Sequence, residues 1–175
     1  MKFIYIHGLN SSKESNKYKI LQEKFGDTIS IFEWCPEEKD IVKRLKKLTL
    51  KIKDSIDEVT IIGDSTGCNF SLQLRKMLND YGVFTRCVLI SPLLSLRQLN
   101  DLSIFNKTLE KQIIDFSYFK ETLILKPLHD ELLSYNFNDF IINNNLIINC
   151  NTTHRFPILK NHIIDIKNYI KSIYL

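Results

Sequence analysis

Residues 63–67 read Gly-Asp-Ser-Thr-Gly, a G-x-S-x-G pattern that can present a serine as a nucleophile. The apolar segment Glu58–Ile62 precedes it and a helical pattern follows at once, which predicts a strand, a sharp turn and a helix. The turn forces strained backbone angles on Ser65. It also brings chain segments so close together that the positions two before and two after the serine, residues 63 and 67, must be glycine. The hydroxyl would then lie beside a helix N-terminus that favours negative charge. In the alternative interpretation, Ser65 only caps the helix.

A nucleophilic serine needs a base, and the base needs a carboxylate that orients it. In the chain order Ser, acid, His, the acid follows a late strand and the His follows the last one. Asp130 lies just after the predicted strand Thr122–Leu125, and His154 lies just after the predicted strand Asn145–Ile148. Both positions are carboxyl ends of strands, where ligands bind in open α/β sheets. We therefore expect Asp130 and His154 to join Ser65.

Other residues compete for these two roles. Glu131 adjoins Asp130, and a shift of one residue in the loop would exchange them, so the sequence leaves both open as the acid. Among the other histidines, His129 is a weaker candidate for the base, and His162 lies inside the last helical pattern.

The loop after the first predicted strand reads His-Gly-Leu-Asn-Ser-Ser from residue 7 to residue 12. In this kind of site, an amide from that loop pairs with the amide after the nucleophile to bind an oxyanion. These would be the backbone N–H groups of Leu9 and Thr66. We expect His7 to form hydrogen bonds within the loop rather than to act as a catalyst. The predicted substrate-binding residues are His7, Gly8, Asn10, Ser11, Leu93 and Leu94.

Short apolar runs alternate with helical patterns along the whole chain. Because the runs are continuously apolar, they predict strands that are buried on both faces. The expected fold is α/β, a mostly parallel sheet of about six strands with helices on both faces. The six predicted strands are Lys2–Ile6, Thr28–Phe32, Glu58–Ile62, Arg86–Ile90, Thr122–Leu125 and Asn145–Ile148.

We expect residues 1–175 to form one domain, in which residues 91–120 are the least regular part. This segment is rich in Leu, Ile and Phe and longer than a plain crossover. It is either a partly helical cap over the site or an ordinary crossover helix, such as Leu109 to Phe116, with a long loop.

The composition is that of a globular protein, with 44% hydrophobic and 25% charged residues. No apolar run approaches the roughly 20 residues that would span a bilayer, so we expect a cytoplasmic protein without a membrane partner. The four cysteines form no C-x-x-C pair, and neither a metal nor a cofactor is expected. A basic stretch, 43–53, interleaves with leucine and isoleucine at helical spacing, which favours a solvated helix face over nucleic-acid binding. The oligomeric state stays open.

Four segments, IYIHGLNSS, GDSTG, HDELL and NTTHRF, together resemble the small bacterial α/β-hydrolase esterases of the YqiA type. The resemblance implies an α/β-hydrolase fold and an esterase or thioesterase with Ser65, Asp130 and His154 as its triad. The chain departs from that family at Cys68, where a second glycine is usual, and at residues 151–153, where small residues are usual.

The function predicted from these residues is the hydrolysis of a small-molecule acyl ester or thioester through an acyl-enzyme. The main alternative is a binding module that has kept the fold without activity. An acyltransferase or a C–C bond hydrolase on the same scaffold is the third possibility.

Overall fold

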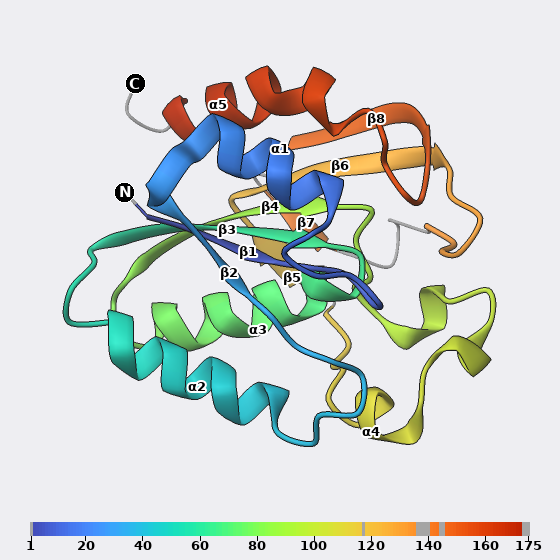
Figure 1. Cartoon of the computed structure of the whole chain (residues 1–175), viewed down its shortest axis with the longest axis horizontal. Helices are drawn as coiled ribbons and strands as arrows, with labels where there is room; N and C mark the ends of the chain where they lie inside the picture. Colours follow the sequence, from blue (N-terminus) through green and yellow to red (C-terminus); the bar gives the residue numbers. More distant parts are fainter. Residues whose placement is uncertain (1, 117, 136–140, 144–145, 173–175) are drawn as a thin grey trace.

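A six-stranded sheet forms the centre of the molecule (Figure 1). The computed structural model describes residues 2–116, 118–135, 141–143 and 146–172. The strand order is β2-β1-β3-β4-β6-β8, and all neighbouring strands are parallel. All six predicted strands are present, although Asn145 lies outside the described residues. The strands are β1 (Lys2–Ile6), β2 (Ile29–Phe32), β3 (Glu58–Asp64), β4 (Phe84–Ile90), β6 (Thr122–His129) and β8 (Leu146–Thr153).

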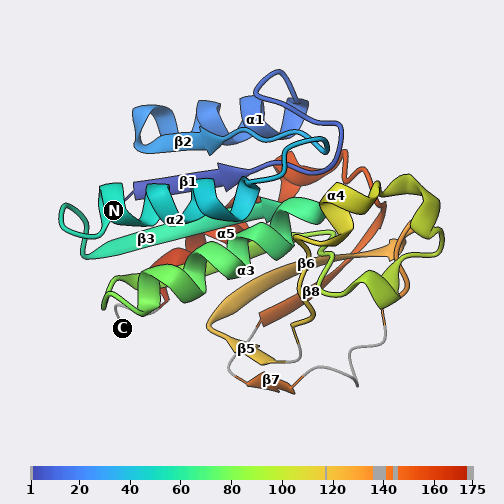
Figure 2. The same cartoon turned by 90° about the horizontal axis from the view of Figure 1, so that it is seen from below.

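Helices cover both faces of the sheet, above and below it in Figure 1, and Figure 2 shows the molecule from the side of α2 and α3. One face carries α1 (Asn16–Phe25) and α5 (Ile163–Lys171), and the other carries α2 (Ile41–Ile52) and α3 (Thr66–Asn79). Since successive side chains of a strand point to opposite faces, each buried strand contributes to two cores. This double burial explains why the sequences of the strands are continuously apolar.

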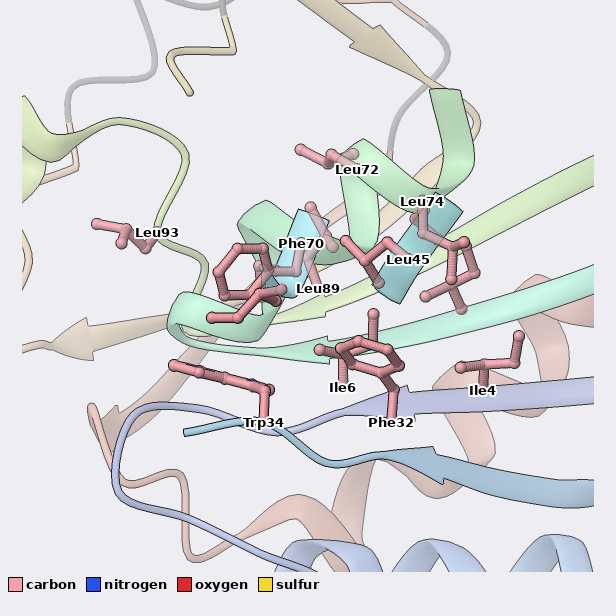
Figure 3. Close-up of a cluster of buried hydrophobic side chains, with 14 of the residues drawn as sticks. Ile4, Ile6, Phe32, Trp34, Leu45, Phe70, Leu72, Leu74, Leu89 and Leu93 are labelled. Carbon is pink, nitrogen blue, oxygen red and sulfur yellow. The ribbon is translucent and has the colours of Figure 1, made fainter. Parts of the chain in front are cut away.

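The core on the α2 and α3 side contains the aromatic residues that support the first loop. Phe32 ends β2 and Trp34 follows it, and both pack beneath α3, where the rings of Trp34 and Phe70 meet edge to face at 5.1 Å (Figure 3). An edge-to-face pair adds about 0.5–1.5 kcal/mol to the stabilisation from its buried area. Trp34 therefore lies at a fixed position under the end of β1.

The chain between β4 and β6 forms short turns rather than a long helix. It contains the 3₁₀ turns Leu96–Gln98 and Leu102–Ile104 and the four-residue helix α4 (Lys107–Glu110), so no helix runs from Leu109 to Phe116. Leu109 and Ile113 are buried in the α2 and α3 core. The later half of the segment thus packs against these helices, and its earlier half extends toward the end of the sheet.

Two further strands lie outside the main sheet. β5 (Tyr118–Lys120) and β7 (Ile141–Asn143) pair in parallel with each other. The sequence analysis did not predict them, because three residues are too few to show a period.

Gly67 provides a test of how closely the chain packs at the start of α3. A Cβ atom at this position would collide with the carbonyl oxygens of Ile6 and His7, which are backbone atoms that cannot turn away. We expect Gly67→Ala to lower the free energy of unfolding by about 3 kcal/mol, the upper end of the usual cost of overpacking, because the opposing atoms belong to the backbone.

Gly82 is the matched control. Its φ is +77° and no heavy atom lies within 4 Å of an added Cβ, so only backbone strain opposes a side chain there. We expect Gly82→Ala to cost about 1–2 kcal/mol in urea unfolding. Equal losses for the two variants would contradict the close approach at Gly67.

Candidate active site

Ser65 occupies the sharp turn between β3 and α3. Its φ of 50° and ψ of −118° are unfavourable for a residue with a side chain. Three hydrogen bonds hold this conformation: the Ser65 N–H donates to Ile90 O at 2.9 Å, and Ser65 O accepts from Cys68 N at 2.9 Å and from Leu93 N at 3.2 Å. The strained turn that the motif predicts is therefore present and is anchored to the end of β4.

The glycines around Ser65 are needed for close packing. A Cβ on Gly63 would lie 2.7 Å from Cα of Cys68, and a Cβ on Gly8 would lie 3.1 Å from Cβ of Ser65. Cys68 lies in the first turn of α3, and its Sγ lies 3.4 Å from Ile90 O. Burial raises the pKa of the Cys68 thiol well above its ordinary value, so this cysteine stays protonated and packs as an apolar residue.

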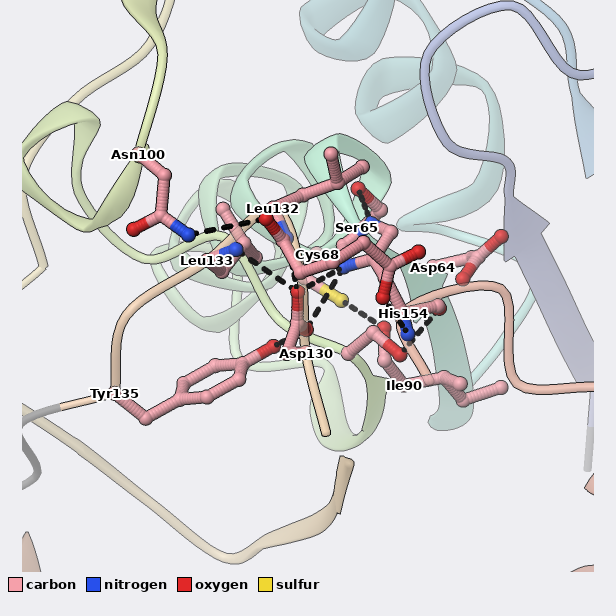
Figure 4. A network of polar contacts seen from close by, with 12 residues as sticks. Asp64, Ser65, Cys68, Ile90, Asn100, Asp130, Leu132, Leu133, Tyr135 and His154 are labelled. Atoms are coloured by element: carbon pink, nitrogen blue, oxygen red, sulfur yellow. Dashed lines mark hydrogen bonds and ion pairs between the residues drawn. The ribbon is translucent and has the colours of Figure 1, made fainter. Parts of the chain in front are cut away.

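The structure brings Ser65, Asp130 and His154 together in one chain of hydrogen bonds (Figure 4). His154 Nε2 lies 2.8 Å from Ser65 Oγ, and His154 Nδ1 lies 2.8 Å from Asp130 Oδ2. The side chains of His154 and Asp130 are only 9% and 2% exposed. The imidazole can therefore accept a proton from the hydroxyl while its other nitrogen donates to the carboxylate.

Neutral donors surround the Asp130 carboxylate. Oδ1 accepts from the backbone N–H groups of Leu132 and Leu133 at 2.9 and 2.8 Å, and Oδ2 accepts from the Tyr135 hydroxyl at 2.8 Å. Burial raises the pKa of Asp130, but the hydrogen bond and charge of His154, with those from Leu133 and Tyr135, outweigh it and lower the pKa below 3.8. The carboxylate is thus ionised at neutral pH. Nothing in the sequence around Tyr135 had marked it as a neighbour of the acid.

Glu131 lies close to His154 but contacts its backbone instead of its ring. Glu131 Oε2 accepts from the His154 N–H at 3.0 Å, and the Ser91 hydroxyl donates to the His154 carbonyl at 2.9 Å. The sequence left Asp130 and Glu131 as alternatives, and the geometry places only Asp130 at the imidazole. The other two candidate histidines bond elsewhere: His129 contacts Asn151, and His162 contacts Asp165.

His7 forms hydrogen bonds on both ring nitrogens with its own surroundings. Trp34 N–H donates to His7 Nε2 at 3.2 Å, so Nδ1 carries the proton and donates to Gly8 O at 2.8 Å. The indole N–H of Trp34 donates to His7 O at 2.9 Å, and the two rings stack. Burial lowers the pKa of His7 below 6.5, which keeps the ring neutral.

These contacts fix the orientation of the peptide between Gly8 and Leu9. Gly8 O accepts from His7 Nδ1 and from Ser11 N, and the Leu9 N–H points the opposite way because a trans peptide is planar. Within the described part of the chain, neither the Leu9 N–H nor the Thr66 N–H has an acceptor. Leu9 and Thr66 both line the cavity at Ser65, so two backbone donors are available to an oxyanion there.

Ser65 and His154 line a cavity of about 980 Å³. Of the residues predicted to contact substrate, Gly8, Asn10, Ser11 and Leu93 line this cavity. His7 and Leu94 do not line it, because His7 is buried against Trp34 and Leu94 is buried in the α2 and α3 core.

Two unlike groups of residues form much of the rest of the cavity wall. One group is apolar and comes from the segment after β4 and the loop after β6: Leu93, Leu99, Ile104, Phe105, Leu132 and Leu133. The other group is polar and comes from α1, the residue before it and the end of β3: Ser15, Asn16, Lys17, Lys19, Glu23 and Asp64.

Neither a metal centre nor a membrane span is found in the described regions. No cluster of three or more His, Cys, Asp or Glu side chains there is suited to a metal ion. None of the helices seen in those regions is both long and apolar enough to cross a bilayer.

The protonation of His7 should make stability depend on pH. Because its pKa is lower in the folded state, the unfolded chain binds a proton more readily as the pH falls. The His7 contribution to the free energy of unfolding is therefore fully present above pH 6.5 and lost progressively below it.

Urea unfolding of the wild type and of His7→Gln between about pH 5 and pH 8 measures this contribution. We expect the wild type to lose more stability than the variant as the pH falls through this window. Asp130, whose pKa is lowered below 3.8, changes the free energy of unfolding only at lower pH. If the free energy of unfolding changes with pH equally in the two proteins, His7 does not cause the pH dependence.

Solved structures of other proteins share this fold. YbtT, a type II thioesterase from the yersiniabactin NRPS/PKS pathway, is 14% identical, with a TM-score of 0.60 over 95% of this chain and 90% of YbtT. ClbQ from the colibactin NRPS/PKS pathway is 12% identical, with a TM-score of 0.68 over 99% of this chain and 98% of ClbQ. An esterase of Pyrobaculum calidifontis is 15% identical, with a TM-score of 0.66 over 99% of this chain and 76% of the esterase.

The sequence itself identifies a family. No curated protein matches it at a significant level. Residues 2–102 match the profile of an "Uncharacterised protein family (UPF0227)", and this match spans β1 to β4, including the turn at Ser65. Because the matched residues make up more than half of the chain, the protein belongs to the uncharacterised family UPF0227, and it has the α/β-hydrolase fold.

Proposed function

We propose that the protein is a serine hydrolase that cleaves a carboxylic ester or thioester through an acyl-enzyme intermediate. The observation that carries this proposal is the chain of hydrogen bonds from Ser65 through His154 to Asp130, each 2.8 Å long. This chain lies at a cavity lined by Leu9 and Thr66, whose backbone N–H groups have no acceptor among the described residues. A serine that only caps α3 would need none of these partners, and Ser65 forms no side-chain hydrogen bond that caps the helix.

The proposed reaction begins when His154 Nε2 accepts the Ser65 proton as Oγ attacks the carbonyl carbon. The carbonyl oxygen becomes an oxyanion, which accepts from the N–H groups of Leu9 and Thr66. His154 then protonates the departing alcohol or thiol, which leaves an acyl group on Ser65. Water, activated by the same imidazole, releases the acid. The Asp130 carboxylate orients the ring and stabilises the imidazolium in both steps.

The cavity favours a substrate with an apolar acyl group. Six leucine, isoleucine and phenylalanine residues line one side of the cavity at Ser65. An acyl chain that packs against them gains a binding free energy of about 25 cal/mol per Å² of apolar surface buried. Esterases and thioesterases of the same fold support a small-molecule substrate of this class. No metal or cofactor takes part in the proposed reaction.

Labelling with a fluorophosphonate tests the nucleophile. We expect the wild type to be labelled and to hydrolyse p-nitrophenyl butyrate, and Ser65→Ala to be unlabelled with at least about 10³-fold lower kcat. Ser55→Ala, which lies beyond the end of α2 and away from the cavity, is the control and should match the wild type.

Other outcomes of this experiment favour the alternatives. No labelling and equal rates for the wild type and Ser65→Ala would support a binding module instead. Labelling of Ser65 without hydrolysis of any ester or thioester would favour an acyltransferase or a C–C bond hydrolase.

The two neighbouring carboxylates should differ in their effect on kcat. Asp130→Asn presents an amide to His154 Nδ1 and disturbs the tautomer, so we expect kcat to fall by about 10⁴-fold. Glu131→Gln keeps an oxygen that can accept from the His154 N–H, so we expect a loss below about ten-fold. Steady-state kinetics on p-nitrophenyl butyrate measures both variants. A larger loss for Glu131→Gln would reverse the assignment of the acid.

A further inference from the structure

A buried ion pair lies directly beside the proposed nucleophile. Lys17 Nζ, from the first turn of α1, lies 2.5 Å from Oδ1 of Asp64, the last residue of β3. The side chains are only 14% and 7% exposed, although both residues reach the wall of the cavity that contains Ser65. Exposed ion pairs contribute little to stability, whereas a buried pair holds its two charges in fixed positions.

The Asp64 carboxylate also lies against the loop that carries an oxyanion donor. A Cβ atom on Gly8 would be 3.4 Å from Asp64 Oδ2, so this oxygen packs beside the backbone of Gly8. The next residue, Leu9, supplies one of the two free amides. Asp64 therefore holds a carboxylate next to both Ser65 (Figure 4) and the place where the proposed reaction creates negative charge.

The other titratable groups that sense the charge of Asp64 are uncharged. Among the described residues these groups are Tyr5 of β1, His7, Cys68 of α3 and Tyr135. Burial raises the pKa of Tyr5, Cys68 and Tyr135 and lowers the pKa of His7, so all four are neutral at pH 7. Within the described regions, Lys17 is the residue that forms an ion pair with Asp64.

An uncompensated carboxylate here would oppose the reaction. Two negative charges within several ångströms repel each other even at an effective dielectric constant of about 20, which slows oxyanion formation by at least about ten-fold. The repulsion acts on the tetrahedral intermediate and not on a neutral ester, so it lowers kcat rather than raising KM.

We propose that Lys17 is a positioning residue, whose ammonium group neutralises Asp64 and so allows the oxyanion to form beside a balanced ion pair. Lys17 acts through Asp64 and need not touch the substrate. The inference rests on the proposed serine hydrolase function.

Four variants test the inference through the sign of each effect on p-nitrophenyl butyrate hydrolysis. Lys17→Met leaves the negative charge of Asp64 unpaired and should lower kcat by at least about ten-fold with little change in KM. Asp64→Asn leaves the positive charge and should keep kcat equal to or above that of the wild type. The double variant should return to within about three-fold of the wild type, because neither charge remains. Lys53→Met removes a lysine that pairs with Asp54 away from the cavity and should change nothing.

A purely structural ion pair gives a different pattern. It predicts that Lys17→Met and Asp64→Asn both lower kcat, in parallel with their melting temperatures. If Lys17→Met does not fold, Asp64→Asn still decides, since a ten-fold fall in its kcat would overturn the inference. Ser65→Ala in the same series separates the two proposals. Equal rates for Ser65→Ala and the wild type would end both, whereas unequal rates with unchanged kcat in Lys17→Met would end this one alone.

Discussion

The site depends on the close approach of two backbone segments, the turn at Ser65 and the end of β1. Gly67 lies against the carbonyl oxygens of Ile6 and His7, and Gly8 lies against Ser65. β1 and β3 are parallel neighbours in the sheet, so both segments leave it at the same edge. This packing fixes the distance between the Ser65 hydroxyl and the free amides of Leu9 and Thr66. The positive φ of Ser65 is the strain that this approach imposes, and the hydrogen bonds to Ile90, Cys68 and Leu93 retain it.

The adjacent strands β6 and β8 place the other two side chains at the same edge. Their pairing changes register between Pro127 and His129, and such an irregularity redirects the side chains that follow it. His154 is held by its backbone as well as by its ring, since Glu131 accepts its N–H and Ser91 donates to its carbonyl. The imidazole therefore has little freedom to leave the line between Ser65 and Asp130. Catalytic groups that are held in this way lose little entropy when substrate binds.

The sequence predicted the parts of this arrangement that carry a local signal. The six strands of the main sheet are apolar runs, and the turn at Ser65 has two obligatory glycines. Contacts between distant segments had no such signal: a one-residue shift would have exchanged Asp130 and Glu131, and nothing marked Tyr135 or Lys17 as neighbours of the site. Helix α1, which supplies Lys17, buries only Tyr18 and Leu21 and so lacks a clear apolar period. The sequence could not decide whether segment 91–120 is a cap or a crossover helix, because its apolar residues contribute both to the α2 and α3 core and to the cavity wall.

Two buried carboxylates lie near Ser65, and the structure treats them differently. Asp130 is surrounded by the amides of Leu132 and Leu133 and by the Tyr135 hydroxyl, which are neutral dipoles that leave its charge in place. Asp64 contacts the ammonium of Lys17, which cancels its charge. In the proposed reaction, a positive charge develops on His154 and a negative charge develops near Leu9 and Thr66. The uncancelled carboxylate contacts the imidazole, and the cancelled one lies beside Gly8, next to the proposed oxyanion donor Leu9. This distribution of charge favours both developing charges of the proposed reaction.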